Sequence, residues 1–128
     1  MSSIPDDLKY TREHEWVRVV GQTVVVGITD YAQNSLGDVV YVDGLENGQE
    51  LKSGATIASI ESVKAVSDIY SPVTGKITEI NGAIANDPAV INKDPYGEGW
   101  LFKASIGDAE SMADLLDAAA YGEFVATL

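Results

Sequence analysis

The sequence predicts a mainly β protein, built as a small sandwich or flattened barrel. Three observations support this. Short apolar or alternating segments recur along the chain, glycine, proline and asparagine separate them, and only two stretches have a helical pattern. The 128 residues include 45% hydrophobic side chains, which is typical of a globular chain. Because domains commonly span ~100–200 residues, we expect a single domain over residues 1–128.

The first predicted elements are a hairpin and a helix. Residues 15–20 and 23–28 are rich in valine, and Gly21-Gln22 between them has glycine first, as a type II′ turn prefers. Residues 29–37 then predict a short helix. Thr29 is its expected N-cap, and Gly37 is expected to end it.

The rest of the chain predicts further strands, a loop-rich stretch and a second helix. The expected strands cover residues 38–42, 56–61, 66–71, 73–80 (which includes a turn at Gly75) and 100–104, and residues 81–99 are expected to form loops. A C-terminal helix over 108–121 is predicted because one face of it would carry Met112, Leu115, Leu116 and Ala119, with Gly122 ending it.

Charge and composition exclude several classes of function. Twenty acidic against eight basic side chains give a net charge of −12, which argues against binding to nucleic acid or anionic membranes. No apolar run approaches the ~18 residues of a membrane span. The first residues lack the features of a targeting segment, so we expect a bacterial-type cytoplasmic location. There is no cysteine, and His14 is the only histidine, so we expect neither disulfide nor metal site.

The most informative segment joins two predicted strands through Ser62-Val63-Lys64-Ala65. This connection contains no glycine, proline or asparagine, but a type I turn accepts such residues. If these four residues form the turn, Glu61 faces Val66 and Ser59 faces Asp68. Glu61 and Asp68 then lie on one face as diagonal neighbours, roughly 7–8 Å apart, beside an exposed lysine.

The lysine in this turn fits one chemical role better than others. A lysine nucleophile is usually activated by desolvation or by a nearby cation, and Lys64 would instead be exposed between carboxylates. We therefore expect no enzyme with Lys64 or the Glu61/Asp68 pair as its catalytic group. A projecting primary amine is suited to acylation by another enzyme, and the alternative is an ordinary solvated lysine in a β-turn.

Several motifs in fixed order resemble one known family. The segment Glu61-Ser62-Val63-Lys64-Ala65 is similar to the lipoylation site of the glycine cleavage system H proteins. The other matching segments, spread over residues 8–121, are Tyr10-Thr11 with His14-Glu15-Trp16-Val17, Gly27-Ile28-Thr29-Asp30-Tyr31-Ala32-Gln33, Leu36-Gly37-Asp38, Ser71-Pro72-Val73 with Gly75, and Ile91-Asn92-Lys93-Asp94-Pro95-Tyr96-Gly97-Glu98-Gly99-Trp100. Biotinyl domains resemble the same hairpin but place methionine on both sides of the lysine, so Val63 and Ala65 disfavour biotin.

The resemblance implies a fold, a cofactor and partners. It implies a hammerhead-like flattened barrel or sandwich of two antiparallel sheets with a short helix and a C-terminal helix, and a non-catalytic carrier with lipoate in amide linkage to Lys64. Such a carrier takes the aminomethyl group of glycine from glycine decarboxylase (P protein) to the aminomethyltransferase (T protein), and its dihydrolipoyl group to dihydrolipoyl dehydrogenase (L protein). A lipoyl-attaching enzyme is a further expected partner, and Glu61 is expected to contribute to its recognition of the turn.

Members of this family hold the loaded arm in a surface cleft, and two carboxylates are candidates to line it. An aminomethyl thioether decomposes when the nitrogen lone pair expels the thiolate, so a carboxylate that keeps the nitrogen protonated protects it. The candidates are Glu15, within the His14-Glu15-Trp16 motif, and Asp68, four residues after Lys64. The remaining alternative is an H-like lipoylated relay or a non-catalytic β-sandwich adaptor for another pathway.

Overall fold

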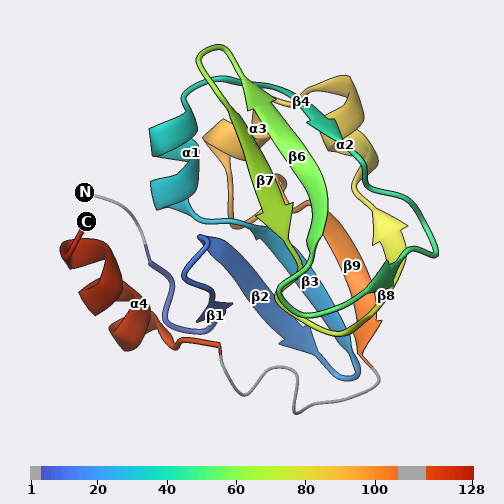
Figure 1. Cartoon of the computed structure of the whole chain (residues 1–128), viewed down its shortest axis with the longest axis horizontal. Helices are drawn as coiled ribbons and strands as arrows, with labels where there is room; N and C mark the ends of the chain where they lie inside the picture. The colour runs from blue at the N-terminus through green and yellow to red at the C-terminus, as the bar shows by residue number, and fades with distance from the viewer. Residues whose placement is uncertain (1–3, 107–114) are drawn as a thin grey trace.

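Two antiparallel sheets form the framework of the computed structural model, which describes residues 4–106 and 115–128 (Figure 1). The larger sheet has the strand order β1 (Lys9–Tyr10), β2 (Glu15–Val20), β3 (Thr23–Ile28), β9 (Phe102–Ile106), β8 (Gly75–Ile80) and β5 (Glu50–Leu51). The smaller sheet has the order β4 (Val39–Asp43), β6 (Thr56–Ser62) and β7 (Val66–Tyr70). The predicted two-sheet β architecture is confirmed, although the sheets do not close into a barrel.

The first hairpin and helix form as the sequence predicts. Gly21 has a φ of 64°, as the first position of a type II′ turn requires, and Val20 pairs with Thr23 across it. Helix α1 (Asp30–Leu36) starts at Thr29, whose hydroxyl accepts the Ala32 N–H. It ends at Gly37, which has a φ of 75° and donates its N–H to the Gln33 carbonyl.

Several strand boundaries differ from the prediction by one or two residues. Strand β4 starts one residue later than expected and extends to Asp43, which pairs with Ser59. Strand β9 starts at Phe102 instead of residue 100, because Trp100 belongs to a turn in which its N–H donates to the Gly97 carbonyl at 3.3 Å. Strands β1 and β5 were not predicted, since two residues are too few for a periodic pattern.

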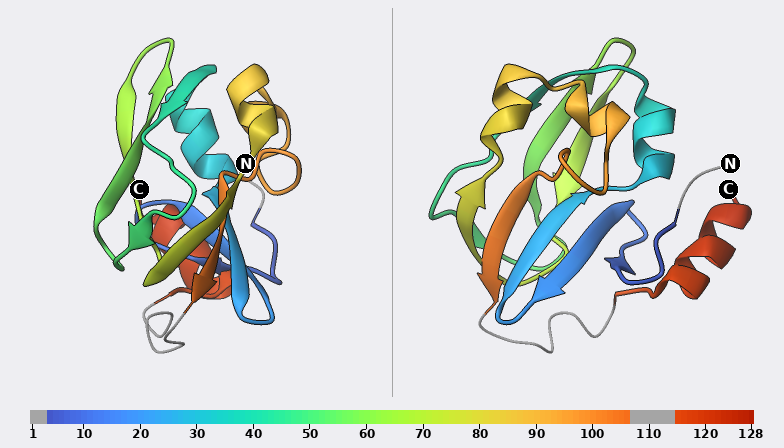
Figure 2. Two further views of the ribbon diagram at one scale, coloured as in Figure 1. Left: turned by 90° about the vertical axis from the view of Figure 1, so that its right-hand side faces the viewer. Right: turned by 180° about the vertical axis from the view of Figure 1, so that it is seen from behind.

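The stretch expected to form loops contains two short helices. Helix α2 (Gly82–Asn86) is capped by Asn81, whose side-chain oxygen accepts the Ala83 N–H at 3.0 Å. Helix α3 (Val90–Lys93) is a single turn. Both helices lie at the same end of the molecule as α1 (Figure 2).

The predicted C-terminal helix is wrong in its bounds. Helix α4 spans Ala118–Ala126 and is capped by the Asp117 side chain, so Gly122 lies inside the helix instead of ending it. Leu116 lies before the helix and forms an isolated β-bridge with Tyr10, with two N···O distances of 2.7 Å. Half of the predicted helix, residues 108–114 with Met112 among them, falls outside the described residues. Two features place the start of the helix later than predicted. Asp117 caps a helix that begins at Ala118, and Leu116 pairs with Tyr10 instead of joining the helix.

The buried residues form two clusters. The larger cluster lies between the two sheets and contains Ile60, Ile69 and Phe102 among others. The smaller cluster packs α4 against the start of the chain through Tyr10, Trp16 and Tyr121, all of which are fully buried. At β3, Gly27 lies against the Trp16 ring: a Cβ there would come within 2.7 Å of the ring atoms. The ring therefore requires glycine at this position.

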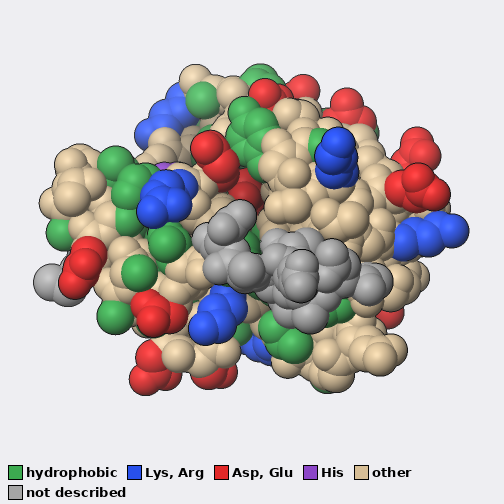
Figure 3. Space-filling model, turned by 60° about the horizontal axis from the view of Figure 1, so that its bottom comes forward, with side chains coloured by type: hydrophobic (Ala, Val, Ile, Leu, Met, Phe, Trp, Pro, Cys, Tyr) green, Lys and Arg blue, Asp and Glu red, His purple; other side chains and the backbone are tan. Residues whose placement is uncertain are grey.

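Charge is distributed over the surface with an acidic excess. On the face shown in Figure 3, acidic side chains lie both at the centre and along the edges, and lysine and arginine side chains lie among them. In the part of the chain that the structure describes, no helix has the length and apolar character needed to cross a membrane.

Candidate functional site

The Lys64 turn has the predicted strand register. Glu61 pairs with Val66 and Ser59 with Asp68, so the two strands flank residues 62–65 as expected. Ser62 closes the turn: its N–H donates to the Ala65 carbonyl at 2.8 Å, and its hydroxyl oxygen accepts the Ala65 N–H at 3.1 Å. Among the described residues only His14 combines a side chain with a positive φ, so the turn needs no left-handed residue. A type I turn meets that condition.

Lys64 is exposed at the tip of this hairpin. The neighbouring Val63 N–H donates to the Asp38 carbonyl at 3.0 Å, which ties the turn to the connection between α1 and β4. The lysine stem lies over Gly37, because a Cβ built there would be 3.3 Å from Lys64 Cε. The amine thus projects from a turn that is braced on one side.

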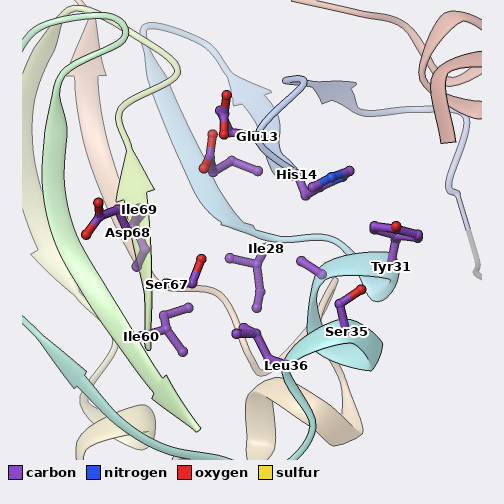
Figure 4. Close-up of a pocket in the computed structure, with 12 residues that line it drawn as sticks. Glu13, His14, Ile28, Tyr31, Ser35, Leu36, Ile60, Ser67, Asp68 and Ile69 are labelled. Atoms are coloured by element: carbon purple, nitrogen blue, oxygen red, sulfur yellow. The ribbon is translucent and has the colours of Figure 1, made fainter. Parts of the chain in front are cut away.

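A pocket of about 140 Å³ lies between α1, the start of β2 and strand β7 (Figure 4). Its apolar walls come from both sheets and from α1, and several polar groups lie on its rim. The lining residues are Glu13, His14, Glu15, Ile28, Tyr31, Ala32, Ser35, Leu36, Ile60, Ser67, Asp68 and Ile69. The combination of aliphatic walls and few polar groups suits a flexible, largely apolar ligand.

Glu15 is the buried carboxyl group of this pocket, with only 2% of its surface exposed. Its Oε1 accepts the Thr11 hydroxyl at 2.6 Å, and its Oε2 accepts the Tyr70 N–H at 3.4 Å. Glu15 therefore links β2 of the large sheet to the end of β7. Burial raises the pKa of Glu15 to about 7, while the hydrogen bonds from Thr11 and Tyr70 partly oppose that rise.

The other two predicted site residues lie on the outer face of the small sheet. Asp68 contributes to the pocket wall, but its carboxylate points away from α1, whereas the neighbouring Ser67 points into the pocket (Figure 4). Alternation along β7 explains this difference, because Asp68 pairs with Ser59 and shares its face with Glu61. The structure thus brings Glu15 into the pocket, whereas the carboxylates of Glu61 and Asp68 share the outer face of the small sheet.

His14 connects the pocket to the C-terminal helix. Its Nδ1 is 2.7 Å from the Tyr121 hydroxyl, which in turn is 2.8 Å from the Thr29 hydroxyl. Burial lowers the pKa of His14, so the neutral imidazole is favoured. No group of three or more metal-binding side chains is present in residues 4–106 and 115–128.

Sequence reasoning missed the contribution of α1 to this pocket. Tyr31 and Ser35, and likewise Ala32 and Leu36, are four residues apart, so each pair lies on one side of the helix. That spacing was readable from the sequence as a helix face directed towards a partner surface. Nothing in the local pattern pointed to Tyr121, which is 107 residues from its partner His14.

Comparisons with known proteins agree on one family. The family model described as "Glycine cleavage H-protein" matches residues 8–128. The glycine cleavage system H protein of Thermotoga maritima is 56% identical over 118 residues, covering 92% of this chain and 95% of its own. That of Symbiobacterium thermophilum is 50% identical over 97% of both chains. A crystal structure of the H protein from Mycobacterium marinum superposes with a TM-score of 0.82 at 38% identity and covers 97% of this chain and 98% of its own.

Proposed function

Because the chain belongs to the glycine cleavage H-protein family, we propose that it is the non-catalytic, lipoyl-bearing carrier of the glycine cleavage system. It carries the aminomethyl group of glycine from the P protein to the T protein and its dihydrolipoyl group to the L protein. The observation that carries this proposal is the exposed primary amine of Lys64 at the tip of a braced hairpin. Tethering raises the effective concentration of the carried group at each active site in turn.

Lipoate in amide linkage to Lys64 fits the residues around the turn. The amine is exposed, and the nearby pocket has aliphatic walls from Ile28, Leu36, Ile60 and Ile69 that suit a hydrocarbon chain and a dithiolane ring. When attached, the dithiolane supplies the two sulfurs for group transfer and redox chemistry, which this cysteine-free chain lacks. The pocket residues would hold the arm by apolar contact and keep water away from it.

Glu15 is the proposed carboxylate that protects the carried amine. Its position in the pocket allows it to pair with a protonated amine, which no longer has a lone pair to expel the thiolate. A cation beside Glu15 lowers the pKa of this carboxyl group from about 7 and favours its ionised form. Asp68 is the second proposed carboxylate, and we expect a smaller contribution because its side chain points to the outer face.

Rates of aminomethyl loss test these two roles. In carrier loaded by the P protein and then separated from it, Glu15→Gln should lose labelled aminomethyl groups about tenfold faster than wild type, the order expected for loss of a buried charged partner. Asp68→Asn should have a smaller effect. Equal rates for wild type and Glu15→Gln would refute the role of Glu15 and leave the carrier function untouched.

Intact-protein mass tests the carrier assignment itself. After expression in a host that has lipoylation enzymes, wild type should gain one lipoyl increment, and Lys64→Arg should gain none while keeping its fold by circular dichroism. Lipoylated wild type should then support bicarbonate exchange by the P protein. A biotinyl increment, an unmodified wild type or residual glycine turnover by Lys64→Arg would contradict the assignment.

Glu61 is proposed to contribute to recognition of the lysine turn. Glu61 lies at the base of the turn on the outer face, where it is placed to contribute to recognition by the lipoyl-attaching enzyme. Glu61→Gln should therefore lower the rate of lipoylation.

Residues 1–128 are proposed to act as one carrier domain, which is supported by the pairing of Tyr10 with Leu116 near the two ends of the chain.

A further inference from the structure

The segment around α3 is a long motif to which the proposed function gives no role. It begins at Ile91 and runs to Trp100, and it lies outside the pocket and outside the lysine hairpin. Helix α3 packs against α1, and both lie at the end of the molecule that carries the Lys64 turn (Figures 1 and 2). The polar contacts of this segment indicate what it does.

The side-chain amide of Asn92, in α3, makes all three of its hydrogen bonds to the end of α1, the start of β4 and the connection between them. Its Oδ1 accepts the Val39 N–H at 2.9 Å, and its Nδ2 donates to the Gly37 carbonyl at 2.8 Å and to Gln33 Oε1 at 3.1 Å. Gly37 and Val39 are the two neighbours of Asp38. Asn92 therefore fixes the backbone on both sides of Asp38 from a position more than 50 residues away in the sequence.

Asp38 is the residue that supports the lysine turn. Its carbonyl accepts the Val63 N–H at 3.0 Å, and Val63 precedes Lys64. The stem of Lys64 also lies over Gly37, the residue whose carbonyl Asn92 binds. Hydrogen bonds and packing contacts therefore connect Asn92 to Lys64 without a gap.

The same segment also contacts the other end of α1. The Tyr96 hydroxyl oxygen accepts the Asp30 N–H at 3.0 Å, in the first turn of the helix. Asn92 binds the Gly37 carbonyl just after the last turn. Since one face of α1 forms a wall of the pocket, the α3 segment holds that wall at both ends.

We propose that Asn92 is a positioning residue for the modification site, which sets how the Lys64 turn is presented to the enzyme that acylates it. This inference rests on the proposed function, because it assumes that Lys64 is the acylated amine. Without Asn92 the connection around Asp38 loses three side-chain hydrogen bonds, and only the pairing of β4 with β6 and the bonds within the hairpin still support the turn. A smaller fraction of molecules then presents Lys64 in the competent arrangement, and the apparent affinity for the enzyme falls by that fraction.

Asn81 provides a matched control. It is also an asparagine with three side-chain hydrogen bonds, from the Ala83 N–H and to the Glu98 and Trp100 carbonyls, and it is buried. Its contacts hold α2 and the Glu98 and Trp100 carbonyls at the far end of the same segment, and none of them involves the connection around Asp38. Asn81 is buried and Asn92 is half-buried, so Asn81→Ala should destabilise the fold at least as much, without acting on the lysine turn.

Steady-state lipoylation of the unmodified protein by a purified lipoate ligase, with lipoate and ATP, tests the proposal. Asn92→Ala should raise the KM for the carrier about fivefold to tenfold and leave kcat within about twofold, as a population effect requires. Asn81→Ala should change neither constant. Asn92→Asp keeps the acceptor for the Val39 N–H but places a carboxylate oxygen against the Gly37 carbonyl, so it should raise the KM at least as much as Asn92→Ala.

Amide hydrogen exchange of Val63 gives a second readout that does not depend on lipoylation. Asn92→Ala should speed this exchange about tenfold, and Asn81→Ala should leave it unchanged. An unaltered Val63 exchange rate in folded Asn92→Ala or Asn92→Asp, or equal KM changes in the Asn81 and Asn92 variants, overturns the inference. If wild type is not acylated at Lys64, the carrier assignment fails, and the exchange experiment still decides whether Asn92 supports the turn.

Discussion

Replacing Glu15 by glutamine should change how the stability of the fold depends on pH. Burial raises the pKa of Glu15 from 4.5 to about 7 in the folded chain. Between these two pH values the folded chain holds a proton that the unfolded chain has released, so the free energy of unfolding falls as pH rises through this window. The loss is complete above pH 7 and amounts to roughly 3 kcal/mol.

Glutamine cannot ionise, so Glu15→Gln should escape this loss. The variant has its own penalty, because its amide presents only one oxygen and Glu15 uses two, for the Thr11 hydroxyl and the Tyr70 N–H. That penalty is about 1–3 kcal/mol and is the same at every pH. The stability of the variant relative to wild type should therefore rise with pH by roughly 3 kcal/mol and level off above pH 7.

Urea unfolding at pH 5, 6, 7 and 8, followed by tryptophan fluorescence, measures this difference. The other titrating groups are shared by both chains, and their contributions cancel to first order in the comparison. Glu46→Gln makes the same chemical change at an exposed site outside the pocket that contains Glu15 and should give a flat difference within about 0.5 kcal/mol. A flat difference for Glu15→Gln as well would refute the reasoning from burial.

Three further substitutions follow from the packing and caps. Gly37→Ala should lower the free energy of unfolding by about 1 kcal/mol or more, because Gly37 has a φ of 75° and a Cβ there lies 3.3 Å from Lys64 Cε. Urea unfolding measures this loss of stability, and the rate of lipoylation of Gly37→Ala should fall as well. Thr29→Val removes the hydroxyl that caps α1 and should cost about 1–2 kcal/mol in the same assay. Ile60→Ala, on the buried inner face of the small sheet, should cost about 2–5 kcal/mol and lower the thermal midpoint, and a loss below 1 kcal/mol would contradict its place in the core.

Local patterns predicted the elements around the lysine well. The hairpin of β2 and β3, helix α1 with its caps, and the register of β6 on β7 all have signals within a few residues of one another. Helices α2 and α3 escaped prediction because five and four residues do not establish a helical period. The start of α4 was misplaced because Leu116 pairs with Tyr10, a contact that no local pattern signals.

Glu15 and Asp68, the two carboxyl groups predicted to line the cleft for the arm, also show what local patterns can and cannot predict. The sequence placed Asp68 on one face with Glu61, and alternation along the strand was sufficient for that conclusion. The burial of Glu15 depends on Thr11 and on Tyr70, and Tyr70 is 55 residues away. Its raised pKa therefore follows from how the two sheets meet.

The sequence by itself determined that a lysine projects from a tight β turn, because turn chemistry and strand alternation are local properties. Only the tertiary structure decided what surrounds that lysine. The pocket beside α1, the buried carboxyl group of Glu15 and the support from Asn92 each join segments that are far apart in the chain. Such contacts arise when the two sheets and the short helices pack on a shared core, and residue spacing along the chain does not encode them.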